Sequence, residues 1–362
     1  MNNKIVFLSI LFLSFALLQI QCKKDPPVTP PPDPEPTHPT ITWRADTIRN
    51  PYKGWQLLLL SIWGSDTNDV YAIGHNAVGG NASLYHFDGT QWSVIKITKA
   101  EGGFIDSYVS FREIDGSGKN DVWAVGRRGG YYGSSIDSSL VIHFDGSSWK
   151  EIQIDRGKHS LQGLKVLGLN DVYMSGTYGE IYHFDGTQFT KIVVDTNLAI
   201  KLGGDKQRMF AGGISTLLYP NQYISVFSKV GNGTWTRITT ATEIEYGQKR
   251  NFGFRDFYPA GSDKYFACGE GIFSIQDTFW HSSSSDKSHP YIRLSGTSPT
   301  NVFALCQTRK ILHWNGVDWR ESNLPENIST NSTLWGLWVK GNNIFISCYY
   351  KEDTNIIYRG TY

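Results

Sequence analysis

The sequence predicts an all-β protein, a seven-bladed β-propeller with four-stranded blades, which follows a signal peptide and a tether. Three observations predict it: a repeated motif, a composition rich in aromatic residues and glycine, and a strand-like segment before the first repeat. Aromatic residues make up 14% of the 362 residues, charged residues only 19%, and there are 37 glycines. Such a composition favours strands joined by tight turns and excludes a helical bundle or a disordered chain.

The first element is an apolar segment, 5–18, which follows Lys4. Its length is typical of a signal-peptide core and is below the roughly 20 residues that a membrane-spanning helix needs. The next residues, Cys22-Lys23-Lys24-Asp25, resemble the lipidated start of lipoproteins from Gram-negative bacteria. We therefore predict a lipoprotein signal peptide at 1–21 and lipid attachment at Cys22. The predicted location is the cell envelope, with the lipid anchor in the outer membrane. The alternative is an ordinary secretory signal that contains a cysteine.

The second element is a proline-rich segment, 26–39, which holds most of the chain's 14 prolines. Such a segment stays extended and acts as a semi-rigid spacer. We predict a tether at 22–40 and the propeller at 41–362.

A motif then recurs along the chain. Its three clearest copies are Asn68–Gly74 with Leu84–Trp92, Asn120–Gly126 with Ile142–Trp149, and Asn170–Gly176 with Tyr182–Phe189. Weaker copies contain Met209, Tyr265, Val302 and Ile344. Each copy predicts four strands: one ending at a glycine turn, an Asp-Val strand, a His-Phe strand, and a fourth after an Asp-Gly hairpin turn. Seven copies over 41–362 give about 46 residues each, the size of a propeller blade.

The segment Thr42–Ile48 precedes the first copy and resembles the fourth strands that begin at Trp149 and Trp319. The last copy lacks a fourth strand. We predict that Trp43 lies beside the strand containing Tyr358, so that the N-terminal strand completes the last blade and closes the ring.

The pattern Asp-Val-Trp-Ala-Val-Gly…His-Phe-Asp-Gly-x-x-Trp, at 121–149, resembles propeller repeats of secreted and lipid-anchored bacterial proteins. It is similar to kelch-type blades, and its corner is similar to the Asp-box of sialidase-like propellers without the serine that opens that box. The resemblance covers nearly all of the chain after the tether. It implies the fold but no activity, because this fold hosts enzymes, binders and assembly factors alike.

Two sets of residues are predicted to be structural. His86, His143, His183 and His313 share one position of the repeat, which places them too far apart for one metal ion, so each should support its own hairpin corner. We predict no metal site and no cofactor. Cys268, Cys306 and Cys348 fall within predicted strands and should be buried free thiols.

The connections differ between the two ends of the strands. Short turns join strands one to two and three to four, whereas longer, irregular loops emerge at the opposite face, where function concentrates on rigid scaffolds. These loops are rich in aromatic and arginine side chains suited to stacking on sugars or contacting protein. The candidate ligand-binding residues are Trp55, Arg127, Arg128, Tyr131, Tyr132, Tyr178, Tyr246, Arg250, Tyr349 and Tyr350.

A net charge of +1 excludes a field strong enough to hold nucleic acid. The leading prediction is a monomeric, non-catalytic surface lipoprotein whose loop face binds a glycan or a protein of the envelope. One alternative is a glycan-acting hydrolase or lyase at the axial mouth, drawing on Glu180, Glu243, Glu245, Asp137, His159 or Glu352. The other alternative is an envelope protein-assembly factor.

Overall fold

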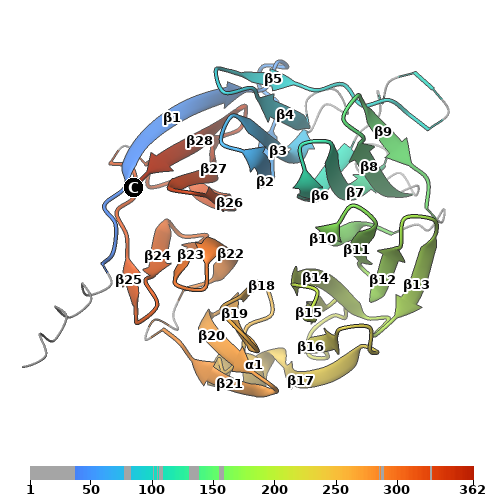
Figure 1. The fold of residues 1–362 in the computed structure, drawn as a ribbon, viewed down its shortest axis with the longest axis vertical. Helices are drawn as coiled ribbons and strands as arrows, with labels where there is room; N and C mark the ends of the chain where they lie inside the picture. The colour runs from blue at the N-terminus through green and yellow to red at the C-terminus, as the bar shows by residue number, and fades with distance from the viewer. Residues whose placement is uncertain are drawn as a thin grey trace, which may run out of the picture. The chain divides into compact units, whose positions relative to one another are not determined.

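The computed structural model describes residues 37–76, 83–100, 102–103, 105, 109–129, 138–154, 159–284, 286, 289–326 and 328–362. The expected signal peptide, Cys22 and most of the expected tether lie outside these residues, as do Tyr131 and Tyr132. In the described part of the chain, no helix has the length and apolar character to cross a membrane. The strands of this part form a ring of antiparallel sheets around a central axis (Figure 1).

Five of the sheets formed by the described residues have four strands each. Three of them are β10 (Leu161–Gly168) to β11 (Asp171–Gly176), β12 (Glu180–Phe184) and β13 (Phe189–Val193); β14 (Leu198–Gly204) to β15 (Arg208–Ser215), β16 (Tyr223–Val230) and β17 (Thr236–Thr242); and β18 (Asp256–Pro259) to β19 (Lys264–Gly269), β20 (Gly271–Gln276) and β21 (Phe279–Ser282). The other two are β22 (Tyr291–Ser298) to β23 (Asn301–Cys306), β24 (Lys310–Trp314) and β25 (Trp319–Glu321); and β26 (Thr333–Lys340) to β27 (Asn343–Lys351), β28 (Thr354–Thr361) and β1 (Thr42–Arg49).

The remaining strands form one eight-stranded sheet. They are β2 (Leu57–Asp66), β3 (Asp69–Asn76), β4 (Leu84–Phe87), β5 (Trp92–Val94), β6 (Val109–Gly118), β7 (Asp121–Arg128), β8 (Ser138–Phe144) and β9 (Trp149–Ile152). The prediction of seven separate four-stranded blades is therefore wrong, because only five four-stranded blades are present among the described residues.

The joint between the two halves of this sheet has a local cause. Strand β4 begins at Leu84, which pairs with Ile73, so β3 continues beyond the end of its neighbour. The last residues of β3 pair with β2 on one side, and on the other His75 pairs with Ser110 of β6. A repeat in the sequence marks the strands of each unit, but it carries no information on such a lateral pairing.

The predicted closure of the ring is confirmed. Strand β1 pairs antiparallel with β28 along its whole length, with Trp43 opposite Gly360 and Ala45 opposite Tyr358. Figure 1 shows this blue N-terminal strand along the outside of the red C-terminal strands. An ion pair of 2.8 Å between Arg359 and Asp46 links the same two strands, so pairing and charge both tie the two ends of the ring together.

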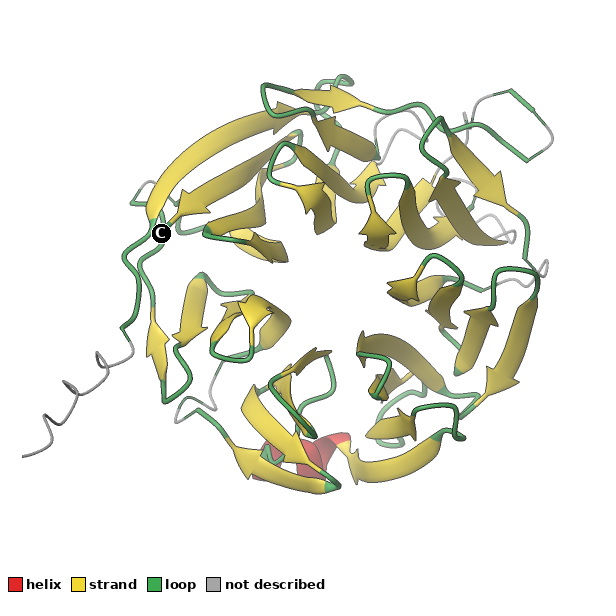
Figure 2. Cartoon of the chain, viewed as in Figure 1, coloured by secondary structure: helices red, strands yellow, loops and turns green. Residues whose placement is uncertain are grey.

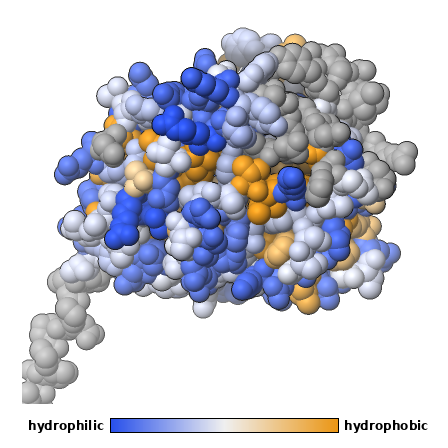
Figure 3. Space-filling view, turned by 90° about the horizontal axis from the view of Figure 1, so that it is seen from above, coloured by the Kyte–Doolittle hydropathy of each residue, from blue (hydrophilic) through white to orange (hydrophobic). Residues whose placement is uncertain are grey.

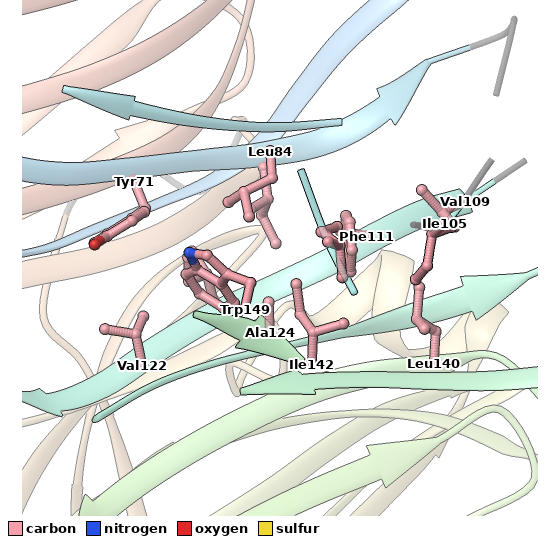
Figure 4. Close-up of a cluster of buried hydrophobic side chains, with 13 residues drawn as sticks. Tyr71, Leu84, Ile105, Val109, Phe111, Val122, Ala124, Leu140, Ile142 and Trp149 are labelled. Atoms are coloured by element: carbon pink, nitrogen blue, oxygen red, sulfur yellow. The ribbon is translucent and has the colours of Figure 1, made fainter. Parts of the chain in front are cut away.

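The innermost strands are β2, β6, β10, β14, β18, β22 and β26, and each contacts the next around the axis. Apolar side chains fill the spaces between neighbouring sets of strands. In the cluster of Figure 4, Tyr71 and Leu84 from the first half of the eight-stranded sheet face Phe111, Ile142 and Trp149 from the second. On the side seen in Figure 3, hydrophilic residues predominate among the coloured ones and hydrophobic residues lie in small groups.

The repeated histidines support their hairpin corners, as predicted. In three copies the histidine Nε2 lies 2.7–2.9 Å from an aspartate Oδ1 at the start of the second strand, and in a fourth it lies 2.9 Å from an asparagine. Each imidazole also lies against an aromatic ring of that strand, as His143 does on Trp123 at 4.0 Å between centroids. The pairs are His86–Asp69, His143–Asp121, His183–Asp171 and His313–Asn301.

Two further findings concern segments between and within strands. Cys268, Cys306 and Cys348 are buried and free, as predicted. The segment that holds Tyr246 and Arg250, which were expected to lie on an irregular loop, instead contains the helix α1 (Glu243–Lys249), shown in red in Figure 2. Thr242 and Glu245 form a capping box at its start, and this pair at this spacing is a sequence signal for the start of a helix.

Candidate functional site

A cavity of about 270 Å³ opens at the mouth of the axis, on the face of the longer loops. This position follows from the topology, because the inner strands start where the chain arrives from the preceding set of strands. Most of its wall comes from the first residues of inner strands and the last residues of their neighbours. Its lining is Leu60, Arg112, Gln162, Ala199, Lys201, Gly212, Gly213, Ile214, Phe254, Arg255, Ile292, Arg293, Gln307 and Trp335.

A recurring β-bulge places side chains in this mouth. Near the start of β2, β6, β10 and β22 the register with the second strand skips one residue, and near the start of β26 it skips two. A bulge bends the strand and redirects the extra side chain. The skipped residues that line the mouth are Leu60, Arg112, Gln162, Ile292 and Trp335.

The segment before β18 achieves the same result. The backbone N–H groups of Phe254 and Arg255 both donate to the carbonyl of Cys268, at 2.9 Å each. Two consecutive donors on one acceptor displace the strand in the way a bulge does. The guanidinium of Arg255 lies over the ring of Phe254, with 5.1 Å from Cζ to the centroid, so the mouth receives a cation and an aromatic edge from this segment.

A buried carboxylate lies directly below the mouth and holds two of its cations. Glu113 Oε2 lies 2.8 Å from Arg293 Nη1 and 3.0 Å from Lys201 Nζ, and Ser61 Oγ donates to Oε1 at 2.6 Å. Burial alone would raise the pKa of Glu113, but Arg293 and Lys201 outweigh it and hold that pKa below its usual value. This cluster joins β2, β6, β14 and β22 across the axis.

The lining of the mouth is rich in positively charged side chains. Four of its lining side chains are cationic, Arg112, Lys201, Arg255 and Arg293, and no carboxylate is among the described residues that line it. Burial, followed by the charges of Arg112 and Arg127, lowers the pKa of His75 to about 4. Burial likewise lowers the pKa of Lys201, despite the nearby Glu113. Both shifts are expected where positive charges gather with limited access to water.

The indole Nε1 of Trp335 and the Nε of Arg255 are among the donors at the mouth that are shielded from solvent and have no acceptor in the described part of the structure. The ion partner of Arg255, Glu270, lies 3.6 Å from its Nη2 rather than at Nε. Buried donors normally have an acceptor, so an acceptor on a ligand placed here would satisfy both groups.

The opposite opening of the axis differs in charge. Its cavity of about 470 Å³ is lined by carboxylates as well as cations, among them Asp115, Asp256 and Lys165. Lys165 Nζ lies 3.2 Å from Asp115, and Asp256 accepts from the backbone N–H of Leu294 at 2.8 Å. Burial raises the pKa of Asp256 to about 6. The charged groups at this end are largely paired within the protein. The two openings of the axis therefore differ, because only the lining of the mouth has cations without carboxylates among its described residues.

The structure describes eight of the ten candidate ligand-binding residues, and none of these eight lines the mouth. Four are on the loop face with exposed or half-buried side chains: Trp55, Tyr178, Tyr349 and Tyr350. Tyr178 contacts the ring of His159 edge-on, at 4.9 Å between centroids. These side chains are available at the surface, and none of them lines the mouth.

The other described candidates have structural contacts. Tyr246 is 4% exposed, and its hydroxyl donates to the carbonyl of Phe252 at 2.9 Å, so it belongs to the core and not to a binding surface. Arg128 forms an ion pair of 2.6 Å with Glu151. Arg250 ends helix α1 in a left-handed conformation, and its Nε donates to the carbonyl of Gly247 at 3.2 Å. Arg127 is half-buried at the end of β7.

Of the groups considered for acid–base chemistry, the structure brings together His159 and Glu180. Their closest atoms, Nε2 and Oε1, lie 3.4 Å apart, and Glu180 also accepts from the backbone N–H of Tyr178 at 2.9 Å. Glu245 caps helix α1. Asp137 lies outside the described residues. The described residues contain no group of three or more His, Cys, Asp or Glu side chains placed to hold a metal ion.

The cations of the mouth lie on the inner strands or directly before one of them, and not on the long loops, so the loop pattern did not predict them. Aligned on the apolar residue that follows, the first strands read Ser61-Ile62, Glu113-Ile114, Lys201-Leu202 and Arg293-Leu294. Charged side chains of both signs at one repeat position of a buried strand are expected only where they pair with each other. This change of charge from one first strand to the next is the sequence signal that indicates the ion-pair cluster at the axis.

Comparison with known proteins supports the fold. No family model matches this chain, and no curated protein matches it. The structure of YCF48 bound to D1 peptide has a TM-score of 0.58 and 18% identity, over 87% of this chain and 96% of that one. YCF48 from Cyanidioschyzon merolae gives 0.57 and 13%, over 86% and 98%. The WD40 propeller domain of Doa1 gives 0.54 and 9%, over 86% and 95%. The chain is a β-propeller.

Proposed function

We propose that this protein is a binding scaffold that holds a segment of another protein at the axial mouth of its loop face. The observation that supports the proposal is a contrast between two parts of each repeat, the hairpin corner and the bulge of the inner strand. The hairpin corners use the same side chains again and again, whereas the bulges of the inner strands present different ones, Leu60, Arg112, Gln162, Ile292 and Trp335, to one cavity.

The surroundings of the mouth support a polypeptide as the ligand. Ile214 lines the cavity, and the chain continues into Leu218 and Tyr219, whose side chains are 84% and 72% exposed. Exposed apolar side chains next to a cavity with donors are typical of protein-binding sites. A propeller of similar fold, YCF48, binds a D1 peptide. No carboxylate is among the described residues of the lining, and its amide acceptors are the side chains of Gln162 and Gln307.

The N-terminal sequence supports a place for this activity. The apolar segment 5–18, Cys22 and the proline-rich segment 26–39 favour a lipoprotein that carries its propeller on a tether at the cell envelope, with the outer membrane as the proposed site. Its partner would then be another envelope protein, and the scaffold would act without catalysis.

The test is selection of binding peptides from a displayed random library on the full chain, followed by affinity measurement. Trp335→Ala removes a wall of the mouth and should weaken the selected peptides at least tenfold. Trp92→Ala removes an indole that donates to Asp46 at 3.0 Å, far from the mouth, and should change affinity less than twofold. Failure to enrich any peptide, or equal effects of the two substitutions, would overturn the proposal. Selective binding of acidic oligosaccharides alone would replace the protein ligand with a glycan.

A further inference from the structure

We propose that the axial mouth recognises a carboxylate of its polypeptide partner, held by Arg255, Lys201 and the indole N–H of Trp335. This inference rests on the proposed function and names the group that the mouth binds. A carboxylate can come from a chain terminus or from an Asp or Glu side chain, and both offer the same two oxygens.

The first support is the balance of charge. The lining carries four cations, and Glu113 below it is shared by two of them, Arg293 at 2.8 Å and Lys201 at 3.0 Å. Glu270 lies 3.6 Å from Arg255, and no carboxylate is among the described residues of the lining itself. A lining with several cations and no carboxylate favours an anion over a cation as the ligand.

The second support is the pair of shielded donors. The Nε1 of Trp335 and the Nε of Arg255 are both buried and lack an acceptor within the described structure. An arginine presents its N–H groups in a planar fork that matches two carboxylate oxygens, and a ring N–H adds a neutral donor. A carboxylate supplies acceptors to both residues without bringing a donor that would find no partner.

The third support is the shape and chemistry of the wall. Leu60, Phe254 and Ile292 supply apolar surface beside the cationic groups, and the cavity measures about 270 Å³. That arrangement suits one or two residues of a chain with an apolar side chain next to the carboxylate. The opposite opening, with Asp115 and Asp256 in its lining, would repel the same group.

The experiment uses the full chain and peptides selected as above, each synthesised in four forms. The forms are a free C-terminal acid, a C-terminal amide, an amide with every Asp and Glu replaced by Asn and Gln, and the free acid with those same replacements. Isothermal titration measures Kd for each. We expect the form without any carboxylate to bind at least tenfold more weakly than the free acid. The remaining two forms identify whether the terminus or a side chain supplies the carboxylate.

Substitutions at the mouth test which side chains bind the carboxylate. Arg255→Gln and Lys201→Gln should each remove most of the preference for the carboxylate, and Arg255→Lys should retain part of it, since the charge stays but the fork is lost. Arg320→Gln is the matched control, because Arg320 is 68% exposed near the hairpin turn of β24 and β25. Thermal unfolding within a few degrees of the unaltered protein shows that the variants fold.

The outcomes separate the two proposals. Peptides that bind equally with and without carboxylates would overturn this inference and leave the scaffold function standing. Carboxylate preference that survives both Arg255→Gln and Lys201→Gln would also overturn it, by placing the anion elsewhere. Tighter binding of glucuronate than of a free-acid dipeptide would assign the mouth to an acidic sugar.

Discussion

The hairpin corners and the axial mouth are built from the same repeats in opposite ways. At the corners, His143 pairs with Asp121 just as His86 pairs with Asp69, and each unit satisfies its own polar groups. At the mouth, equivalent positions hold different residues, and Glu113 of one strand is satisfied by Arg293, Lys201 and Ser61, which lie on three other strands. Polar groups that pair within one unit allow the same residues to recur in every unit. Polar groups that pair across the axis instead link units that are far apart in the sequence.

The largest effect is expected at the axis. Arg293→Ala leaves Glu113 buried with one cation fewer and removes a donor to the carbonyl of Leu60, 3.4 Å away. Removing one partner of a buried ion pair costs about 3–5 kcal/mol of unfolding free energy. Urea unfolding at pH 7 measures the loss.

The same substitution tests whether the axis is coupled. Adding Glu113→Gln to Arg293→Ala should recover part of the lost stability, because it removes the stranded charge. If the two losses simply add, Glu113 and Arg293 do not stabilise each other, and the contrast with the corners fails.

The next effect concerns pH. Burial raises the pKa of Asp256 to about 6 from 3.8, so the folded state binds a proton more tightly than the unfolded state. The stability this group contributes is full below pH 3.8 and is lost as the pH rises through 6. Asp256→Asn removes that loss, so relative to the unaltered protein the variant should gain about 3 kcal/mol between pH 3 and pH 8. Chemical unfolding of both proteins across that range measures it, and parallel curves would contradict the assignment.

A smaller effect is expected at a corner. Asp121 accepts from Trp123 Nε1 and His143 Nε2, both at 2.8 Å, and also from Ser117 Oγ, and its side chain is buried. Asp121→Ala leaves these donors without an acceptor and should cost about 2 kcal/mol.

The matched substitution Asp171→Ala should cost less, since the Asp171 side chain is one-third exposed and water can replace it. The two losses should add in the double variant, because the corners are independent. If the two losses of stability, measured by thermal unfolding, are strongly non-additive, the corners are coupled to each other and do not differ from the axis in this respect.

The smallest effect is expected at the closure of the ring. Asp46 accepts from Trp92 Nε1 at 3.0 Å and pairs with Arg359 at 2.8 Å, in a partly exposed position. Asp46→Ala should cost about 1 kcal/mol, because eight backbone pairs between β1 and β28 remain. Calorimetric unfolding measures the loss, and a cost as large as that of Arg293→Ala would mean that closure depends on this side chain.

The same contrast explains what could be predicted from the sequence. The corners and the closing strand were predictable because Asp-Val, His-Phe and Asp-Gly recur, and because Thr42–Ile48 has the pattern of a fourth strand. The joint at His75 and Ser110 was not, since it depends on where β4 begins in space. The mouth was missed because its residues differ from unit to unit, and candidates such as Tyr246 were taken from loops that proved to be structured.

The most direct test of the account is site-specific photo-crosslinking of a selected peptide to the full chain. A benzophenone side chain replaces Gln162 or Gln307, which both line the mouth, and Lys119 at a hairpin turn on the opposite face serves as the control. The account predicts adducts from both mouth positions and none from Lys119. Adducts from Lys119 with none from Gln162 or Gln307 would contradict it.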